Sequence, residues 1–402
     1  MGANAGWPAQ TQLTRPWRQK YRGGTADDRT LSAVQVSLPP RIANRDFWCL
    51  PALAVEMETG LQQIAALDAI HGQHLAALGT LLLRTESVAS SKIERVEASV
   101  DDYARALYGA KSNTSAVSMA DATEALDVLI HAVDGGQEVT LTSMLTAHQL
   151  LMRNDPAERG YAGRLRDMQN WIGGSDHSPR NAFYVPPPPE TVDEYLDDLV
   201  LFANRTDLPV LVQAASAHAQ FESIHPFTDG NGRIGRALVN TILRRRGATS
   251  RVVVPLASAL VARRDHYFEI LGDYRRGHPE MIIAAFAAAS NVAARESRAT
   301  AERIAAFPDD VRRVVGTLRA GSATSRLVGE LTAHPVFSAE EAEVLVGGST
   351  SGVYAAIARL AGVGVLRPLS DRKRNQVWGV AAMLDELEDL GQRIAAAARS
   401  SA

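Results

Sequence analysis

Apolar residues recur at steps of three and four along most of this chain, which is the spacing of one face of an α-helix. The clearest run covers residues 61–109, and its apolar positions include Ile64, Leu67, Ile70, Leu75, Leu78, Leu82 and Val88. The same spacing predicts further helices over 119–133, 142–152, 192–204, 211–222, 234–243 and 262–295. Because the composition is also rich in Leu and Ala and poor in aromatic residues, we predict a mainly α fold.

The helical spacing is interrupted at residues 225–236, which read His-Pro-Phe-Thr-Asp-Gly-Asn-Gly-Arg-Ile-Gly-Arg. Pro226, Gly230 and Gly232 break helices, so this segment is predicted to be a loop between two helices. The second helix is expected to begin near Asn231. A helix N-terminus presents N–H groups without intrahelical partners and a partial positive charge, and it therefore attracts phosphate.

Four side chains of this segment have chemistry that suits a nucleotide. Asp229 offers the hard oxygen that Mg²⁺ takes alongside phosphate oxygens. Arg233 and Arg236 share a helix face, and guanidinium groups bind phosphate in a bidentate manner. His225 has an ordinary pKa of about 6.5, which makes it the natural general base. Phe227 has no such chemistry and is predicted to anchor the loop in the core. Each residue alone is typical of a turn or a helix surface, but the combination favours a nucleotidyltransferase.

The segment resembles the signature of Fic-domain proteins, His-x-Phe-x-Asp/Glu-Gly-Asn-Gly-Arg-x-x-Arg, with every specified position filled. The resemblance implies a protein adenylyltransferase that uses ATP with Mg²⁺ and leaves AMP on a Ser, Thr or Tyr hydroxyl of a target protein. It implies that His225 is the base, that Asp229 holds Mg²⁺, and that Arg236 binds the γ-phosphate. The other ATP contacts that it implies come from Gly230, Asn231, Gly232 and Arg233. Kinase-like members carry Lys in place of Gly232, so the glycine favours nucleotidyl transfer.

Residues 163–189 look like the flap of this family, a β-hairpin expected to hold a segment of the target by strand addition. The alternation of Trp171 with Phe183 and Val185 around a Gly- and Pro-containing stretch also predicts two short strands joined by a long loop. Without the signature, an ordinary exposed hairpin would be the simpler interpretation.

The N-terminal helical region contains a second resemblance. Ser90 and Glu94 are four residues apart and would share a helix face. They resemble the Fic inhibitory motif Ser/Thr-x-x-x-Glu-Gly/Asn, placed before the core as in class II members. By this resemblance Glu94 would pair with Arg236 and keep the γ-phosphate out of its seat. Arg95 departs from the motif, since Gly or Asn is expected there. The alternative to an inhibitory role is that Glu94 is an ordinary exposed glutamate on the helix, beside Lys92.

The composition limits the partners, the disulfide bonds and the location that we expect for this chain. The net charge is −3, so no global field draws the chain to nucleic acid or to an anionic membrane. The single cysteine, Cys49, excludes an intramolecular disulfide and suits a cytoplasmic location. The longest apolar runs, such as 77–83 and 281–289, are too short to span a bilayer, and we see no signal segment at the N-terminus.

At 402 residues the chain is expected to hold two or three domains. We predict an N-terminal region with the inhibitory helix at 1–110, whose first 35 residues are polar and partly extended. A Fic catalytic core is predicted at 111–300 and a separate C-terminal domain at 308–390. The polar stretch 293–308 is predicted to connect the last two as a helix.

The C-terminal domain resembles a winged helix-turn-helix. Helices are predicted at 339–346 and 350–360, and strands at 363–366 and 376–379 flank a charged wing. The second helix would read a DNA groove, and Arg372, Lys373 and Arg374 would contact phosphates. Residues 308–402 hold 11 Lys+Arg and 11 Asp+Glu, so the usual basic excess is missing. Docking to a protein or to a second copy of the chain, as a homodimer, therefore stays open beside DNA.

Two alternatives to adenylyl transfer stay open at this point. The same scaffold could transfer another group, UMP or phosphocholine, since nothing in the sequence reads the base. The chain could instead be a DNA-binding regulator that uses the Fic core as a nucleotide sensor. The intact His225 argues against a sensor, which needs phosphate contacts but no base.

Overall fold

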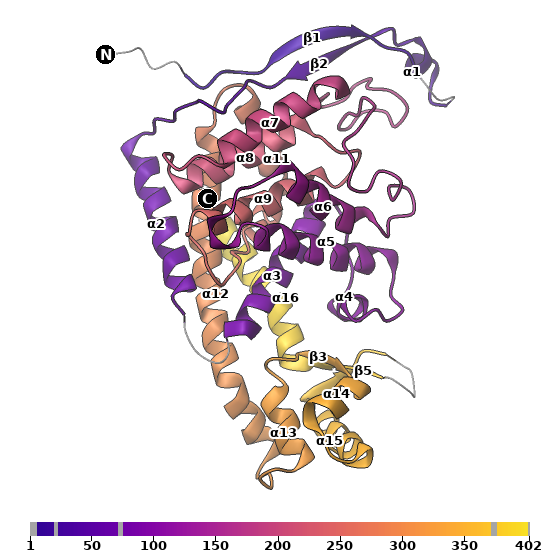
Figure 1. Cartoon of the computed structure of the whole chain (residues 1–402), viewed down its shortest axis with the longest axis vertical. Coiled ribbons are helices and arrows are strands. Elements are labelled where there is room, and N and C mark those ends of the chain that lie inside the picture. The colour runs from indigo at the N-terminus through magenta and orange to yellow at the C-terminus, as the bar shows by residue number, and fades with distance from the viewer. Residues whose placement is uncertain (1–5, 20–22, 71–74, 371–375, 401–402) are drawn as a thin grey trace. The chain divides into compact units, whose positions relative to one another are not determined.

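The computed structural model describes residues 6–19, 23–70, 75–370 and 376–400, and it is mostly helical (Figure 1). The predicted mainly α fold is therefore confirmed. The chain divides into two compact units. Unit 1 comprises Met1–Glu58, Ala125–Ala248 and Arg264–Ala287, and unit 2 comprises Thr59–Glu124, Thr249–Arg263 and Ala288–Ala402. The three-part division expected from the sequence, at 1–110, 111–300 and 308–390, stays a prediction.

Unit 1 is built around the helix pair α8–α9. Its elements are β1 (Thr11–Pro16), α1 (Ala26–Thr30), β2 (Ala33–Leu38), η1 (Asp134–Gly136), α6 (Leu141–Met152), η2 (Pro189–Thr191), α7 (Val192–Ala203), α8 (Val210–Ile224), α9 (Asn231–Arg245), α11 (Arg264–Arg275) and parts of α2 (Pro51–Asp68), α5 (Thr114–His131) and α12 (Glu280–Val315). Every residue from Leu211 to Ile224 is buried. Gly235 lets the two helices approach closely, since a Cβ there would lie 2.9 Å from Glu222 Oε1.

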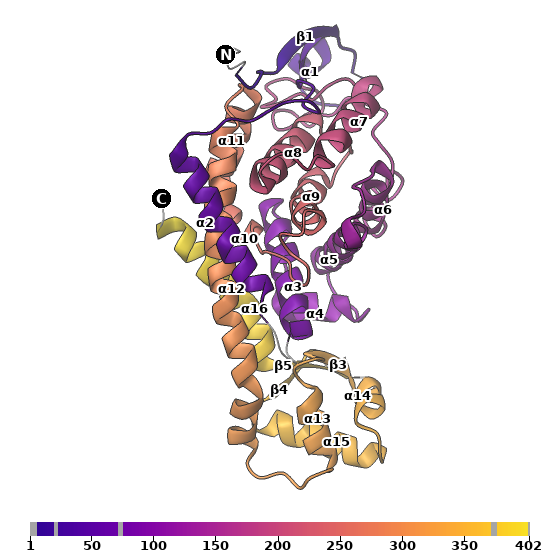
Figure 2. The ribbon, with the colours of Figure 1, turned by 60° about the vertical axis from the view of Figure 1, so that its left-hand side comes forward.

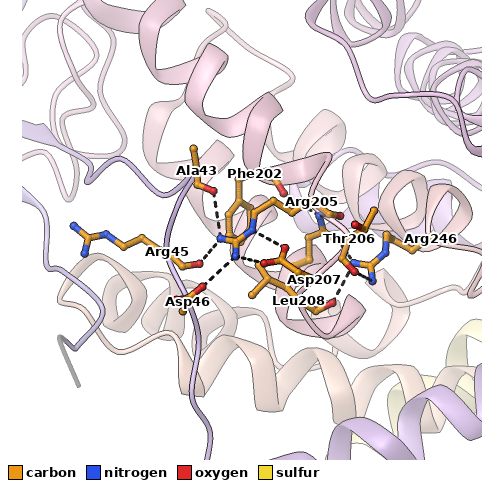
Figure 3. Close-up of polar contacts among 10 residues, drawn as sticks. Ala43, Arg45, Asp46, Phe202, Arg205, Thr206, Asp207, Leu208 and Arg246 are labelled. Atoms are coloured by element: carbon orange, nitrogen blue, oxygen red, sulfur yellow. Dashed lines mark hydrogen bonds and ion pairs between the residues drawn. The ribbon is translucent and has the colours of Figure 1, made fainter. Parts of the chain in front are cut away.

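Two arginines fix the turn that leads into α8 (Figure 3). Arg205 forms ion pairs with Asp46 at 3.1 Å and with Asp207 at 2.7 Å. Arg246, directly after α9, donates to the carbonyl of Leu208 at 3.1 Å. These contacts tie the start of α8 to the end of α7, to the end of α9 and to the N-terminal segment. The N-terminal end of α8, opposite the end that leads into His225, is thereby held in place.

The N-terminal segment forms more structure than its polar composition predicts. Strands β1 and β2 pair antiparallel, with Thr11 opposite Leu38. Val36 packs with Val185, and the Ser37 N–H donates to the Val185 carbonyl at 2.8 Å. The segment predicted to be partly extended therefore contains two paired strands. Its contact with Val185 was not predicted, because that residue lies far along the chain.

Unit 2 holds the remaining elements, which are α3 (Leu75–Ile93), α4 (Val100–Leu107), α10 (Ala257–Val261), α13 (Ala323–Glu330), β3 (Val336–Ser338), α14 (Ala339–Val346), α15 (Thr350–Gly362), β4 (Leu366–Pro368), β5 (Val377–Val380) and α16 (Ala381–Ser400). Helix α3 packs against α10 and α16, and the Ala257 N–H donates to Glu86 Oε2 at 2.8 Å. The stretch 293–308 is helical as predicted, but the helix does not end there. Pro308 lies inside α12, which continues to Val315.

The C-terminal part of unit 2 groups α13, α14 and α15 with a three-stranded antiparallel sheet of order β3-β5-β4 (Figure 2). The two helices predicted at 339–346 and 350–360 are present as α14 and α15. The first predicted strand, 363–366, begins only at Leu366, because Val363 caps α15 and Gly364 has a φ of +77°. Within the predicted wing, Arg372, Lys373 and Arg374 lie outside the described residues.

Across the ranges that the structure describes, no single helix has the length and apolar composition needed to cross a membrane. The pair α14–α15 meets these criteria only when it is joined across a bend of 111°.

Candidate active site

His225 caps the C-terminal end of α8 in a left-handed backbone conformation. Its φ is 50° and its ψ is 62°, and its N–H donates to the Phe221 carbonyl at 2.8 Å. This conformation costs a non-glycine residue roughly 1–2 kcal/mol, and strain of this kind clusters at functional sites. Pro226 follows and cannot continue the helix, because it has no N–H to donate.

A buried arginine holds this helix end. Arg166 is 2% exposed, and its Nε donates to the His225 carbonyl at 2.8 Å. Its Nη2 donates to the Pro187 carbonyl at 2.6 Å, and its backbone N–H donates to the Pro226 carbonyl at 3.0 Å. Burial lowers the pKa of the guanidinium to about 10, which leaves it charged at neutral pH. Arg166 had no predicted role, because no local pattern marks an arginine whose partner carbonyl lies 59 residues away.

The imidazole of His225 is neutral at pH 7. Burial lowers its pKa to about 3, the charges of Arg166 and Arg275 act in the same direction, and the Glu222 backbone opposes them. Arg275 of α11 is fixed at this place, since it donates to the Glu222 carbonyl at 3.2 Å and its guanidinium lies 3.6 Å from the Tyr184 ring centroid. A neutral imidazole keeps one ring nitrogen without a proton, so it can accept the proton of a hydroxyl group.

The loop after His225 is closed by Asn231. The Asn231 side chain accepts from the Phe227 N–H at 2.8 Å and donates to the Phe227 carbonyl at 2.9 Å. Asn170 donates to the same carbonyl at 2.9 Å. Phe227 is fully buried, as predicted, and stacks on His148 with ring centroids 3.7 Å apart. Both polar ends of the Asn231 side chain therefore bond to the backbone of Phe227 and hold the loop.

His148 of α6 supports the loop from the other side. Its Nδ1 accepts from the Gly163 N–H at 3.0 Å, so the proton resides on Nε2, which donates to the Asp229 carbonyl at 3.1 Å. Burial lowers the pKa of this ring to about 4. His148 was not recognised in the sequence, where it is one polar residue within a helical pattern.

Helix α9 begins directly after the loop, at Asn231 as predicted. Its N-cap is Gly230, with a φ of 76°, and no side chain caps the helix. The first intrahelical hydrogen bond runs from the Ile234 N–H to the Gly230 carbonyl, at 3.1 Å. The N–H groups of the first turn, including that of Gly232, precede this bond and point beyond the helix start. The positive end of the helix dipole therefore faces the loop.

The structure brings the predicted residues of the 225–236 segment together in unit 1. Asp229 lies in the loop with its side chain 57% exposed, and its Oδ1 accepts from the Gly230 N–H at 2.6 Å. Arg233 and Arg236 lie on the first turns of α9 and are 7% and 2% exposed. Arg233 Nη2 is 3.9 Å from Asp229 Oδ2. One carboxylate and two guanidinium groups therefore follow His225 within the segment 225–236.

The surroundings of Asp229 fit a Mg²⁺ ion that is shared with a nucleotide. Its carboxylate is exposed, and one oxygen accepts from a single backbone N–H. Within the described part of the chain, no three His, Cys, Asp or Glu side chains gather into a metal site. Mg²⁺ is usually bound by one or two carboxylates together with substrate phosphates and water. The donor set therefore suits metal that arrives with a triphosphate better than a permanent protein cage.

With this geometry established, comparison with known proteins identifies the domain. Residues 138–243 match the model of the Fic/DOC family. The chain carries a Fic domain. The protein adenylyltransferase fic-1 of Caenorhabditis elegans is 34% identical over 146 residues, which is 34% of this chain and 25% of that protein. The probable protein adenylyltransferase aq_aa38 of Aquifex aeolicus is 26% identical over 198 residues, or 49% of this chain and 56% of that protein.

The similarity to these relatives is confined to part of each protein. The chain spans about a quarter of the length of fic-1 and about half of that of aq_aa38. The crystal structure of a Fic family protein from Desulfovibrio desulfuricans G20 superposes with a TM-score of 0.53 and 19% identity. The superposition covers 83% of this chain and 97% of the chain in that crystal structure. This likeness establishes a shared fold.

The segment expected to be the flap of the Fic domain is paired by a single β-bridge, Ile172 with Tyr184. The two short strands predicted there are therefore reduced to one pair of residues. Gly173 and Gly174 turn the chain with φ of +73° and +76°, and the prolines from Pro186 onward have no N–H to extend a ladder. Phe183, next to the bridge, is 88% exposed.

The loop of this flap is tied to the N-terminal segment. Ser178 donates to Asp28 Oδ1 at 2.6 Å, and both residues are buried. Hydrogen bonds from Ser175 and Ser178 hold the pKa of Asp28 far below its usual range. At the base of the flap, the Tyr184 hydroxyl donates to the Ser223 carbonyl at 2.7 Å, which fixes the flap to the end of α8.

The two residues expected to inhibit the Fic domain lie in unit 2. Ser90 belongs to the last turns of α3, and Glu94 follows the final helical residue, Ile93. The helix ends in a Schellman motif, with the Val96 N–H donating to the Ser91 carbonyl and the Arg95 N–H to the Lys92 carbonyl, both at 3.0 Å. Arg95 has a φ of 61°. The departure from Gly or Asn noted in the sequence thus falls on a left-handed position, where those two residues are favoured.

Proposed function

We propose that this protein transfers AMP from ATP to a Ser, Thr or Tyr hydroxyl of a target protein. The observation that carries the proposal is the neutral His225, held by Arg166 at the end of α8 and followed within one loop by the uncapped start of α9. A base beside an anion-binding helix start is what nucleotidyl transfer requires. The curated relatives of the domain are named protein adenylyltransferases, which supports the same reaction.

In the proposed reaction the hydroxyl oxygen of the target attacks the α-phosphorus of ATP. The new bond joins this oxygen to phosphorus, the bond between the α-phosphorus and its bridging oxygen to the β-phosphate breaks, and pyrophosphate leaves. The hydroxyl proton passes to the unprotonated nitrogen of His225. Because the transition state carries dispersed negative charge, fixed positive groups around it supply most of the stabilisation.

The phosphate chain would be bound along the loop and α9. The N–H groups of the first turn and the Arg233 guanidinium would hold the inner phosphates, and Arg236 would hold the γ-phosphate. Asp229 would hold Mg²⁺, which supplies charge neutralisation on the phosphate oxygens when it is bound. The side chain of Asn231 would act through the loop, since both of its polar ends contact the backbone of Phe227.

For the target, we propose that the flap aligns an extended segment by strand addition. The bridge of Ile172 with Tyr184 leaves the rest of the hairpin outside any strand, and Phe183 exposes 88% of its surface beside that bridge. Backbone pairing would set the register, and the Phe183 ring would contact a side chain of the target. The hydroxyl to be modified would then face His225.

We further propose that Glu94 inhibits the enzyme by pairing with Arg236. One guanidinium cannot serve a carboxylate and the γ-phosphate in the same geometry, so the two compete. Ser90 would support the helix end that carries Glu94. Removal of the Glu94 carboxylate should then raise both ATP affinity and transfer.

The experiment that tests these assignments measures transfer of label from α-³²P-ATP to protein with Mg²⁺. The samples are wild type, Glu94→Gly, and the double variants that add His225→Ala or Asp229→Ala. We expect label to rise with Glu94→Gly and to vanish in both double variants. Undiminished label in Glu94→Gly/His225→Ala would remove His225 as the base. Equal label in wild type and Glu94→Gly would remove the inhibitory role of Glu94 and leave the transferase intact.

For the C-terminal part of unit 2, we propose a winged helix-turn-helix used mainly for docking to proteins, including a second copy of the chain. Two of its arginines are engaged internally, since Arg359 donates to the Val315 carbonyl at 3.0 Å and Arg367 pairs with Asp101 and Asp385 at 2.8 and 2.6 Å. The even balance of charges in 308–402 gives little attraction for DNA. A gel shift with the gene's own upstream DNA at low salt tests this. A shifted band would favour DNA binding instead.

A further inference from the structure

Unit 2 contains a cavity of about 340 Å³ on one side of α3. Its walls come from α3, the start of α4, α5, α10 and α16. Most of the lining is apolar, including Val88, Ala89, Met119, Val261 and Leu387. A volume of this size and a mainly apolar lining are typical of sites for small organic ligands.

Two polar groups of the lining have no partner in the part of the chain that the structure describes. Ser258 is 1% exposed, and its Oγ makes no hydrogen bond to any described residue. A buried hydroxyl without a partner is unfavourable, so a ligand atom that bonds to it would be favoured. Lys92 also lines the cavity, and no ion pair joins its ammonium group to a described residue.

The remaining charged group at the cavity is Glu388. It is exposed and accepts from Gln392 at 3.3 Å, so its carboxylate already has a hydrogen-bond donor. Lys92 and Ser258 therefore decide which ligand fits. We propose that this cavity binds an amphipathic monocarboxylate, with the carboxylate at Lys92 and Ser258 and the apolar body against the helices.

The proposed ligand would contact the face of α3 that turns away from the proposed inhibitory residues. Thr85, Val88, Ala89 and Lys92 line the cavity at steps of three and one, which places them on one helix face. Ser90 is rotated by roughly half a turn from that face, at about 100° per residue. Glu94 follows the last residue of the helix and is not among the residues that line the cavity. Binding therefore does not require Glu94 to move, and it can be tested without the transferase activity.

Gly391 of α16 offers a way to block the cavity without removing any contact. It lines the cavity, and a Cβ added there would meet no atom nearer than Ser258 Oγ at 4.0 Å. Gly391→Leu would place its side chain in the cavity, while Gly391→Ala is a matched control with little added volume. Both residues are better helix formers than Gly, by about 1 kcal/mol, so both variants are expected to fold.

The test titrates decanoate, 1-decanol and decylamine into the full-length protein by calorimetry. We expect decanoate to bind with one site per chain and about tenfold or more tightly than decanol, which is the effect of one added charge pair. Gly391→Leu should weaken decanoate by about tenfold or more, and Gly391→Ala should leave it within about threefold. Lys92→Met should bring decanoate to the level of decanol.

Three results would overturn the proposal. The first is the absence of saturable decanoate binding to wild type. The second is an equal affinity of wild type and Gly391→Leu, which would place the ligand elsewhere. The third is tighter binding of decylamine than of decanoate, which would assign the charge recognition to Glu388. None of these results depends on AMP transfer.

Discussion

Gly230 should be the most sensitive glycine of the site, and the chain supplies its own control. Gly230→Ala places a Cβ on a residue with φ +76°, 2.9 Å from Leu151 Cδ2 and 3.1 Å from Met152 Sδ. Both neighbours are buried, at 2% and 1% exposure, so neither can move into solvent. Gly247→Ala also places alanine in a left-handed backbone conformation, with φ +71°, but nothing lies within 4 Å of the new Cβ.

The magnitudes separate the two effects. The left-handed conformation costs Ala roughly 1–2 kcal/mol at either position. Overpacking at Gly230 adds about 1–3 kcal/mol. The unfolded chain changes equally in both variants, so its entropy cancels from the comparison. Gly247→Ala should lose about 1–2 kcal/mol of unfolding free energy, and Gly230→Ala should lose about 2–5 kcal/mol.

Urea titration measures both losses, and ATP binding by calorimetry measures the effect on the site. Gly230→Ala should weaken ATP binding, because the new Cβ is too close to Leu151 and Met152 and the N-terminus of α9 must shift to relieve the contact. Gly247→Ala should leave ATP binding unchanged. Equal losses of stability in the two variants would refute the packing argument at Gly230. Unchanged ATP affinity in Gly230→Ala would show that the start of α9 does not bind the phosphates.

Three further predictions concern the ends of α3 and α8 and the buried rings. Arg95→Gly should raise the unfolding free energy by about 1 kcal/mol, because it relieves the left-handed arginine; a loss of stability in urea would contradict this. Burial lowers the pKa of His148 to about 4 and of His218 to about 3, so the unfolded chain binds more protons below pH 6.5. Each ring should therefore remove about 2 kcal/mol of stability between pH 7 and pH 5. Replacing both rings, as His148→Gln and His218→Gln, should remove these two contributions from the pH profile and leave that of the third buried ring, His225. A lysine ammonium in Arg166→Lys cannot donate to the His225 and Pro187 carbonyls at the same time, as the guanidinium does. Arg166→Lys should therefore lower the unfolding free energy by about 1.5–3 kcal/mol, and it should slow AMP transfer while ATP affinity stays unchanged.

Local patterns predicted the parts of the site that depend on neighbours in sequence. The break at Pro226 and Gly230, the start of a helix at Asn231 and the burial of Phe227 all follow from helix-breaking residues and apolar spacing. The helices at 339–346 and 350–362 follow in the same way.

Residues that act across the fold could not be predicted. Arg166 donates to the His225 carbonyl 59 residues away, and His148 donates to the Asp229 carbonyl 81 residues away. Neither contact has a signal within a short window. The pairing of Ser37 with Val185 was missed for the same reason. The continuation of α12 through Pro308 to Val315 was also not predicted, since the connecting helix was expected only over 293–308.

The most direct test of the central claim is a comparison of α-³²P-ATP and γ-³²P-ATP as donors for the Glu94→Gly variant with Mg²⁺. Adenylyl transfer predicts labelled protein from the α-labelled nucleotide only, because the γ-phosphate leaves with pyrophosphate. Label from the γ-labelled nucleotide alone would mean phosphorylation and would contradict the account.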